Sequence, residues 1–369
     1  MSNAMDKKLL LAGGGTGGHL FPALAVADLW EAGGGETLFV GAEGGMECSL
    51  IPRHGKRLVT LRVGKLKGSG PLARARTLLG IPGAILSARR VLREFQPHAV
   101  LGMGGYASAP AVIAARLAGI PTLLHDQNAI PGLTNRRLGR FADRILTGFA
   151  QATGYFPAGR AVETGNPVRE SLVRDVPPLT PPAPGEPWQI LIFGGSQGAR
   201  IFTEVVPEAL DRLHRQGVSL QVRQQARSED LEEVRTAYRT AGIEAEVAPF
   251  FTEMTSAYRQ AHLVISRAGA SSVAELAATG RPSLLVPYPF AADDHQTANA
   301  KPLTDAGGAW TQSQKNFNVS WLTAFLADRL GDPAALELAG RRARTLARPR
   351  AAADMMDEIL QLLARQGNG

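Results

Sequence analysis

The feature that most constrains the fold of this chain is an apolar run followed at once by a glycine-rich loop and a helical pattern. Near the start, Lys7–Ala12 precedes the loop Gly13–His19 and a predicted helix over Pro22–Glu31. In the second half, Trp188–Phe193 precedes the loop Gly194–Gly198. Alternation of short apolar strands with helices is typical of a parallel sheet covered on both faces. The sequence therefore predicts two Rossmann-like α/β domains.

Further strands and helices continue this alternation in both halves. The additional predicted elements are strands over Glu36–Val40, His98–Leu101, Pro121–His125, Leu220–Arg223, Ala245–Ala248, His262–Ile265 and Ser283–Val286, and helices over Ala109–Ala118 and Ala199–Gln216. A turn at Gly165-Asn166-Pro167 and a proline-rich loop over Val176–Pro187 mark where the alternation restarts. We predict domains over residues 5–164 and 165–347. An amphipathic helix over residues 348–366 could pack on either domain, including back on the first.

Composition indicates a folded chain without a membrane span. The chain has 369 residues, of which 44% are hydrophobic and 20% charged, enough for a core in each of two domains. The longest uncharged stretch, Gln96–Ala115, is interrupted by glycines and Pro110, which argues against a transmembrane helix. Cys48 is the only cysteine, so no internal disulfide can form, as suits a reducing compartment.

The positive charge of the chain is concentrated in its first half. Residues 1–160 hold 19 Lys and Arg against 9 Asp and Glu, a balance of +10, whereas the remainder carries −3. This asymmetry indicates that one half meets an anionic partner, either a phosphorylated ligand, an anionic membrane surface or nucleic acid. Nucleic acid is the weakest of these readings, because only 6% of residues are aromatic and no nucleic-acid module is present.

The first glycine loop has the spacing G-x-G-x-x-G at Gly13, Gly15 and Gly18. Glycines between a strand and a helix let backbone amides approach a phosphate at the positive end of the helix. A dinucleotide-binding oxidoreductase would also need an acidic residue ending the second strand, and Glu43 fits that position poorly. A tight turn without any ligand is the other interpretation of this loop.

Five more loops follow predicted strands and carry polar residues. They are Gly102–Pro110, His125–Asn128, Gly194–Arg200, Ser266–Glu275 and Pro287–Asn299. Polar side chains at the carboxyl ends of strands are where open α/β sheets bind ligands. Glu275 could accept hydrogen bonds from two ribose hydroxyls, or could simply favour the helix dipole.

The sequence gives little support for a metal site. Asp293-Asp294-His295 is the best group of ligand types, and the chain contains no Asp-x-Asp pair and no His-x-x-x-His. We therefore expect no metal ion and no cofactor. The residues alone favour two Rossmann-like domains that bind a nucleotide or a nucleotide sugar.

Taken together, the loops resemble one family. The matching segments, which follow one another in order over nearly the whole chain, are Gly13–Ala27, Gly102–Ala115, His125–Leu138, Gly165–Arg169, Gly194–Arg200 and Ser266–Leu303. They resemble the signature segments of the MurG family, bacterial N-acetylglucosaminyltransferases of peptidoglycan synthesis. The resemblance implies a GT-B fold, in which two Rossmann-like domains face a central cleft. It implies inverting transfer of N-acetylglucosamine (GlcNAc) from UDP-GlcNAc to the C4 hydroxyl of the N-acetylmuramyl group of lipid I, giving lipid II.

The resemblance also implies roles for particular residues. Contacts with the donor UDP-GlcNAc would come from Arg169, Ser196, Gln197, Gly198, Phe251, Arg267, Ala270, Ser271, Glu275, Gln296 and Asn299, and also from Thr16, Gly17, Gly18 and Asn128, four residues that would meet the acceptor diphosphate as well. The acceptor lipid I would contact Gly15, Gly104, Gly105 and Tyr106.

Two departures from the family pattern stand out. The usual His-Glu-Gln-Asn segment has Asp126 in place of the glutamate, an acid one methylene shorter. A segment that usually resembles His-Gln-x-Gly instead reads Arg223-Gln224-Gln225-Ala226, so its glycine is lost.

Inverting transfer needs a base for the acceptor hydroxyl and charge stabilisation for the departing UDP. His19 is the first candidate base because the ordinary pKa of histidine suits proton acceptance near neutral pH, and Asp126 and His125 are its competitors. Backbone amides, a helix dipole and Arg169 or Arg267 would meet the diphosphate in place of a metal ion.

A lipid acceptor implies contact with the cytoplasmic face of the plasma membrane. Basic residues surround an apolar stripe in one segment, with Lys65, Lys67, Arg74, Arg76, Arg89, Arg90 and Arg93 around Leu78, Leu79, Ile81, Ile85 and Leu86. This pattern is typical of peripheral binding to anionic lipid, or of an ordinary amphipathic helix. Alternatives of the same fold are a UDP-GlcNAc 2-epimerase and a transferase to another lipid-linked acceptor. A nucleotide-sugar-binding protein without turnover is a further alternative.

Overall fold

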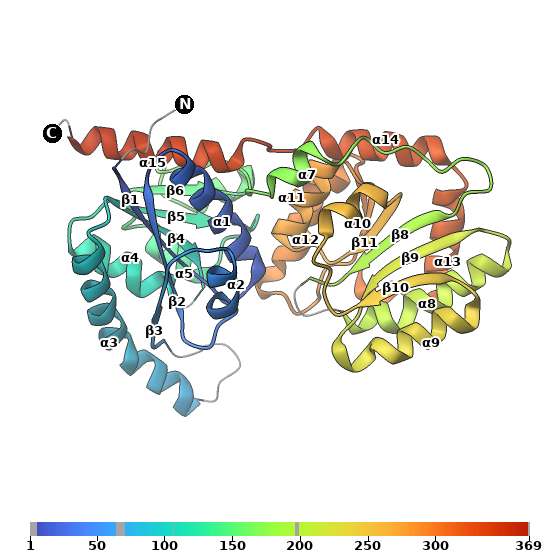
Figure 1. The fold of residues 1–369 in the computed structure, drawn as a ribbon, viewed down its shortest axis with the longest axis horizontal. Helices are drawn as coiled ribbons and strands as arrows, with labels where there is room; N and C mark the ends of the chain where they lie inside the picture. Colours follow the sequence, from blue (N-terminus) through green and yellow to red (C-terminus); the bar gives the residue numbers. More distant parts are fainter. Residues whose placement is uncertain (1–5, 64–70, 106, 196–198, 368–369) are drawn as a thin grey trace. The chain divides into compact units, whose positions relative to one another are not determined.

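The computed structural model describes residues 6–63, 71–105, 107–195 and 199–367, with the backbone alone over 71–79 and 366–367. The chain divides into two compact units (Figure 1). Unit 1 comprises Met1–Val168 together with Arg350–Gly369, and unit 2 comprises Arg169–Pro349. No helix among the described residues combines the length and the apolarity needed to cross a bilayer.

Unit 1 is built on a parallel sheet with seven strands in the described residues, in the order β3-β2-β1-β4-β5-β6-β7. The strands are β1 (Lys8–Gly13), β2 (Glu36–Ala42), β3 (Leu58–Leu61), β4 (Ala99–Gly104), β5 (Thr122–Asp126), β6 (Arg144–Thr147) and β7 (Ala161–Glu163). The helices are α1 (Gly17–Ala32), α2 (Glu47–Arg53), α3 (Pro71–Phe95), α4 (Ser108–Leu117), α5 (Leu133–Leu138), α6 (Ala150–Thr153) and α15 (Ala351–Gly367).

The alternation of side chains along β1 explains how helices cover both faces of this sheet. Leu9 and Leu11 pack into a core with α1 and with Ile359 of α15. Leu10 and Ala12 point the other way, into a core with α3 and α4. A strand buried on both faces must be apolar throughout, which is why β1 is a continuous apolar run.

Unit 2 repeats the same strand order in a parallel sheet, β10-β9-β8-β11-β12-β13, within the described residues. Its strands are β8 (Trp188–Phe193), β9 (Leu220–Gln225), β10 (Glu244–Ala248), β11 (Leu263–Ser266), β12 (Ser283–Leu285) and β13 (Ala309–Thr311). Its helices are α7 (Glu170–Arg174), α8 (Arg200–Arg215), α9 (Leu231–Ala241), α10 (Met254–Gln260), α11 (Ala270–Thr279), α12 (His295–Asp305), α13 (Val319–Leu330) and α14 (Pro333–Arg344).

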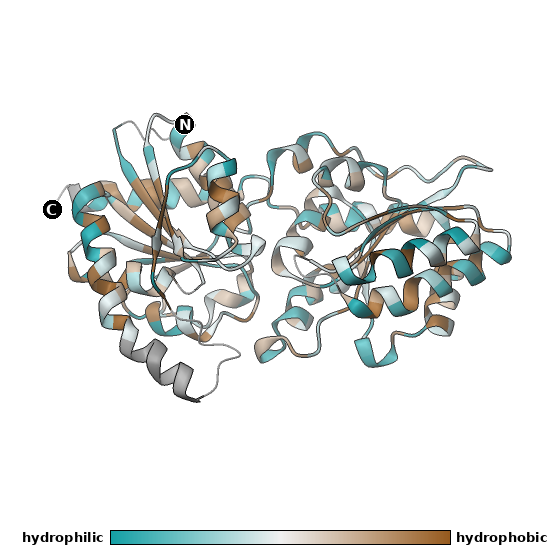
Figure 2. Cartoon of the chain, turned by 60° about the horizontal axis from the view of Figure 1, so that its bottom comes forward, coloured by the Kyte–Doolittle hydropathy of each residue, from teal (hydrophilic) through white to brown (hydrophobic). Residues whose placement is uncertain are grey.

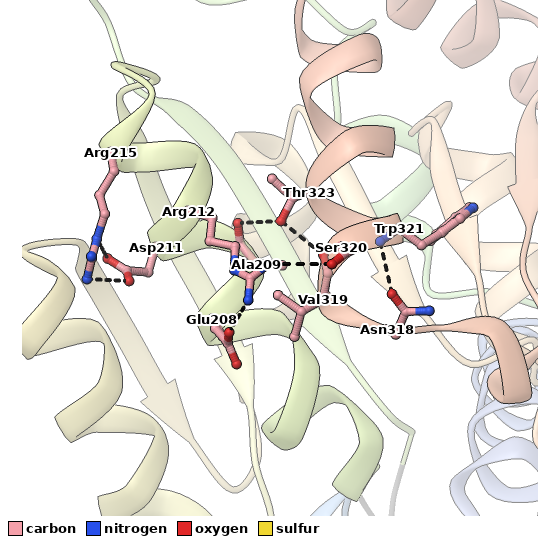
Figure 3. Close-up of polar contacts among 10 residues, drawn as sticks. All are labelled: Glu208, Ala209, Asp211, Arg212, Arg215, Asn318, Val319, Ser320, Trp321 and Thr323. Carbon is pink, nitrogen blue, oxygen red and sulfur yellow. Dashed lines mark hydrogen bonds and ion pairs between the residues drawn. The ribbon is translucent and has the colours of Figure 1, made fainter.

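Polar contacts between α8 and α13 fix one helix pair of unit 2 (Figure 3). The Thr323 hydroxyl donates to the Ala209 carbonyl at 3.3 Å, and Arg212 donates to the Ser320 hydroxyl at 3.4 Å. Asn318 caps α13 by accepting from the Trp321 N–H at 3.0 Å. The two helices also share an apolar core, to which Phe202 and Leu210 of α8 and Leu322 and Leu326 of α13 belong.

The predicted fold class, α/β with two Rossmann-like units, is confirmed by both sheets. Figure 2 shows hydrophobic residues concentrated in the strands, the pattern from which they were predicted. The predicted start of the first helix is wrong, because α1 begins at Gly17 rather than Pro22. The short strands β3, β6, β7 and β13 were not predicted. They have only three or four residues each, too few for a clear pattern.

Candidate functional site

In each unit the predicted glycine loops follow the strands at which the strand order changes direction. β1 and β4 are neighbours in the sheet of unit 1, and β8 and β11 are neighbours in the sheet of unit 2. Open α/β sheets bind ligands beyond the carboxyl ends of the strands at such a switch point. The loops after these four strands therefore define the candidate half-site of each unit.

The loop after β1 holds His19 in a defined orientation. Its Nδ1 lies 2.9 Å from the Gly14 carbonyl oxygen and 3.4 Å from Thr16 Oγ1. Because a carbonyl oxygen can only accept, Nδ1 carries the proton of the neutral ring and Nε2 keeps its lone pair. The loop thus leaves His19 able to accept a proton at Nε2.

Two glycines at the end of β4, Gly104 and Gly105, make room for this arrangement. The Gly14 N–H donates to the Gly104 carbonyl at 3.3 Å. A Cβ on Gly104, whose φ is +98°, would lie 2.9 Å from His19 Nε2, and a Cβ on Gly105 would collide with the Gly14 carbonyl. Glycine is required at both positions, for space and for backbone conformation. The loops after β1 and β4 are therefore in direct contact.

The surroundings of His19 keep its ring neutral at pH 7. Burial lowers the pKa of His19 below its ordinary value of 6.5. The Gly14 carbonyl and the charges of Asp126 and Glu47 oppose that shift only in part. The neutral ring is the form that a general base requires.

Asp126, at the end of β5, organises the loop that follows it. Its carboxylate accepts from the backbone N–H of Asn128 at 3.0 Å, from that of Gly132 at 3.1 Å and from Asn135 Nδ2 at 2.9 Å. The residue is 2% exposed, and its burial raises its pKa while these bonds lower it. The shorter acid at this position thus holds the loop that carries Asn128, with its charge acting on His19.

His125, which precedes Asp126 in β5, is fully buried, with 0% of its side chain exposed. Its Nδ1 accepts from Gln127 Nε2 at 3.1 Å, and the same amide donates to the Met103 carbonyl at 2.8 Å. Burial lowers the pKa of His125 to about 4. The Gln127 amide thus links the His125 ring of β5 to the backbone of β4, whereas His19 lies nearer the surface.

One amide of the first glycine loop is bonded within the protein. The Gly15 N–H donates to Glu47 Oε2 at 2.9 Å. Thr16 is exposed, and Gly17 and Gly18 form the first residues of α1.

In unit 2, Glu275 lies on α11, the helix that follows β11. Its Oε2 accepts from the Tyr258 hydroxyl at 3.0 Å, and the charge of Arg169 acts on the same carboxyl group. Burial raises the pKa of Glu275, an effect that Arg169 and Tyr258 oppose. A carboxylate has about four acceptor sites, so Glu275 can take further hydrogen bonds from a pair of hydroxyls.

Arg267, directly after β11, is 8% exposed and is used inside the protein. Its guanidinium donates to the carbonyls of Val286 at 3.0 Å and Pro287 at 3.3 Å, and it lies 5.4 Å from the ring centroid of Tyr288. Burial lowers the pKa of Arg267 to about 10, so it stays charged at pH 7. Its immediate effect is to hold the segment after β12.

The other donor-side candidates lie near this segment. Gln296 Oε1 accepts from the Tyr288 N–H at 2.9 Å, and Asn299, which is 0% exposed, donates to the Ala268 carbonyl at 3.2 Å. Both residues come from α12, so that helix is joined to the loops after β11 and β12. Three further candidates, with buried or partly buried side chains, are Phe251, Ala270 and Ser271.

Four predicted site residues, Tyr106, Ser196, Gln197 and Gly198, lie outside the described residues. The last three belong to the loop after β8 in unit 2, and the start of that loop is described. The Gly194 N–H donates to Gln225 Oε1 at 3.2 Å, and Gln225 Nε2 donates to the Pro249 carbonyl at 3.0 Å. Within the described part of the chain, no three His, Cys, Asp or Glu side chains group as metal ligands.

Several residues that hold these half-sites were assigned no role from the sequence. Gln127 joins β4 to β5, Tyr258 bonds to Glu275, and Gln225 supports the second glycine loop. Gln225 precedes Ala226, which stands where the family has a glycine. This departure from the family pattern was the one sequence signal that pointed to Gln225. Gln127 lies within the polar segment His125–Asn128, which the sequence analysis had already singled out, whereas Tyr258 carries no spacing pattern that could have identified it.

Comparison with known proteins gives a consistent result over the whole chain. The glycosyltransferase family 28 N-terminal domain matches residues 9–147, and the glycosyltransferase family 28 C-terminal domain matches residues 189–355. A protein of Magnetococcus marinus is 52% identical over 368 residues, which cover 98% of each chain. That relative is named UDP-N-acetylglucosamine--N-acetylmuramyl-(pentapeptide) pyrophosphoryl-undecaprenol N-acetylglucosamine transferase.

Two solved structures extend the comparison. MurG of Acinetobacter baumannii has a TM-score of 0.79 and 34% identity, covering 96% of this chain and 99% of its own. A UDP-N-acetylglucosamine 2-epimerase has a TM-score of 0.68 with 15% identity, covering 99% of this chain and 98% of its own. The second similarity shows a shared fold only.

We expect the buried His125 to make the stability of the protein pH-dependent. Its pKa is about 4 in the folded protein and near 6.5 when unfolded, so the unfolded chain binds the extra proton between these values. The stabilisation is present above pH 6.5 and is lost as the pH falls toward 4. Between pH 7.5 and 5 the loss is about 2 kcal/mol. Urea unfolding of the wild type and of His125→Gln checks this, since their difference should shrink by that amount at pH 5. Parallel pH curves would contradict it.

Proposed function

The chain belongs to the MurG family within glycosyltransferase family 28, and on that premise we propose that it transfers GlcNAc from UDP-GlcNAc to lipid I. The C4 hydroxyl of the N-acetylmuramyl group attacks the anomeric carbon with inversion, which gives lipid II and releases UDP. The observation that carries this proposal is the 52% identity over 98% of the chain to a transferase of that name.

Donor binding falls to unit 2 in this proposal. Glu275 accepts the ribose hydroxyls, and Gln296 and Asn299 contact the GlcNAc. Support comes from the hydrogen bonds that link α12 to the loops after β11 and β12, because a sugar-binding surface must hold its polar groups in fixed directions. Phe251 lies beside the uracil. Ser196, Gln197 and Gly198 meet the diphosphate.

Acceptor binding and proton removal fall to unit 1. His19 is the general base, acting through Nε2, and Thr16, Tyr106 and Asn128 bind the acceptor. The protonated Nδ1 and the lowered pKa of His19 support this choice over His125, whose Nδ1 accepts from Gln127 in the interior. Asp126 supports the same choice indirectly, since its carboxylate already holds the following loop.

The departing UDP carries its charge on the diphosphate. We assign its stabilisation to backbone amides at the second glycine loop, to the positive end of the following helix and to Arg169, whose charge also acts on Glu275. Arg267 contributes by holding the segment after β12. The proposal includes no metal ion, since the sequence has no Asp-x-Asp pair to hold one. It includes no cofactor either.

A peripheral position on the cytoplasmic face of the plasma membrane completes the proposal, because the acceptor is a lipid. Support comes from large apolar side chains exposed on or beside α3, α4 and α5, namely Leu86 (66%), Leu117 (66%), Phe141 (63%) and Leu133 (56%). Arg90, Arg93, Arg137 and Arg140 are exposed on the same elements. Exposed apolar groups with surrounding cations are typical of binding to anionic lipid. Lys65 and Lys67 and the side chains of residues 71–79 lie outside the described residues.

The reaction itself is tested by supplying UDP-GlcNAc with and without a lipid I analogue. We expect release of UDP only when the acceptor is present, together with an acceptor product heavier by one GlcNAc. An epimerase would convert UDP-GlcNAc without acceptor, and a binding protein would release no UDP. Either of these results would overturn the proposal, as would equal turnover with unrelated glycolipids.

Replacement of the base tests the role of His19. We expect His19→Ala to lower kcat by about 10²–10⁴-fold with little change in the KM for UDP-GlcNAc. Because only the neutral ring accepts a proton and its pKa lies below 6.5, the wild-type rate should fall only when the pH drops below that value. Exposed His54→Ala is the matched control and should keep the wild-type kcat. A near-wild-type kcat for His19→Ala would remove His19 from this role.

Membrane binding is tested by sedimentation with vesicles. We expect binding to anionic vesicles to exceed binding to neutral ones and to weaken with salt. Replacing Leu86 and Phe141 by serine should reduce it, whereas Leu338→Ser, a change at a 40% exposed leucine of unit 2, should not. Equal, salt-insensitive binding to both kinds of vesicle would count against the membrane assignment.

A further inference from the structure

Glu47 is the most deeply buried carboxylate near the first glycine loop, and no motif identified it. It is the first residue of α2 and is 0% exposed. Its Oε1 accepts from the Ala42 N–H at 2.7 Å, and its Oε2 accepts from the Gly15 N–H at 2.9 Å. A buried carboxylate is costly unless hydrogen bonds satisfy it, and here backbone amides from two segments do so.

The backbone around Glu47 leaves space for this carboxylate and for little else. A Cβ placed on Gly14, Gly41 or Gly45 would collide with Glu47 side-chain atoms. At each of these three glycines the backbone therefore approaches the Glu47 side chain closely, which the absence of a Cβ allows. This enclosure holds the carboxylate in one position relative to the loop after β1.

The bond from Gly15 reaches His19 through a single peptide group. The N–H of Gly15 and the C=O of Gly14 belong to the same planar unit and point in opposite directions, because the described chain has no cis peptide bond. Glu47 accepts from one end of this unit, and His19 Nδ1 donates to the other end at 2.9 Å. A negative charge at the N–H end polarises the peptide and strengthens its carbonyl as an acceptor.

We infer that Glu47 is a positioning residue for the transfer step, acting on His19 through the Gly14–Gly15 peptide. Its carboxylate fixes the peptide plane, the Gly14 carbonyl keeps the proton on Nδ1, and Nε2 stays available to the acceptor hydroxyl. The inference rests on the proposed function in giving His19 the role of base. The geometry of the three groups does not depend on that role.

The charge of Glu47 also acts on the ionisation of His19. The titratable groups that act on this ring are Asp126 and His125 from β5 and Glu47 from α2. Glu47 raises the pKa of His19, so its removal should lower that pKa further. The acid limb of the rate profile should then move to lower pH.

The first measurement needs no variant. Full-length protein labelled with ¹⁵N-histidine reports the tautomer of each ring by long-range proton–nitrogen correlation, and His19→Ala assigns the His19 signals. We expect the Nδ1–H tautomer for His19 in the wild type. The Nε2–H tautomer would overturn the inference, whether or not any variant folds.

The second measurement compares Glu47→Gln with Glu43→Gln, an exposed glutamate four residues earlier that pairs with Arg62. The amide at position 47 offers only one acceptor oxygen to two N–H groups. We expect kcat to fall about tenfold or more, the KM for UDP-GlcNAc to change little, the Nδ1–H tautomer to lose population and the acid limb to move down. Glu47→Asp keeps the charge and should restore the position of the acid limb. Glu43→Gln should match the wild type throughout.

The outcomes separate the two proposals. Wild-type kcat and tautomer in Glu47→Gln would overturn the inference, as would a loss of kcat with an unchanged tautomer and an unmoved acid limb. If Glu47→Gln fails to fold, the inference is judged from two other measurements. These are the His19 tautomer of the wild type, and the His19 tautomer and acid limb of the rate profile of Glu47→Asp. A wild-type protein with the expected tautomer but no acceptor-dependent UDP release would instead contradict the proposed function.

Discussion

The half-site of unit 1 depends on one hydrogen bond, from His19 Nδ1 to the Gly14 carbonyl oxygen. This bond sets both the direction of the ring and the nitrogen that keeps its lone pair. It can form because the loop after β1 and the loop after β4 approach each other through glycines, with the Gly14 N–H bonded to Gly104. The sheet brings these loops together, since β1 and β4 are neighbours. The orientation of one imidazole thus follows from the strand order.

The two units share a strand order but support their first glycine loops differently. In unit 1, the charged Glu47 accepts from the Gly15 amide. In unit 2, the neutral Gln225 accepts from the Gly194 amide and is itself held by the Pro249 carbonyl. The first glycine loop is thus held by a charged carboxylate in unit 1 and by a neutral amide in unit 2.

The sequence predicted the elements that are buried on both faces, because these must be apolar throughout. Trp188–Phe193 was predicted and observed with the same bounds. Arg144–Thr147 carries polar residues and owes its extended form to neighbouring strands, so no local pattern indicated it. The glycine loops were recognisable from spacing. Glu47 was not, because its partners are backbone amides, which leave no trace in the side-chain pattern.

Unit 1 is assembled from two separate stretches of the chain. Met355, Ile359 and Leu360 of α15 share a core with Leu9 and Leu11 of β1, and Arg144 pairs with Glu358 at 2.7 Å. During synthesis, all of unit 2 emerges from the ribosome before this helix does. Until α15 is synthesised, the face of the unit 1 sheet that carries Leu9 and Leu11 is covered by α1 without its second helix. Chain order alone makes the half that carries the proposed base the last to mature.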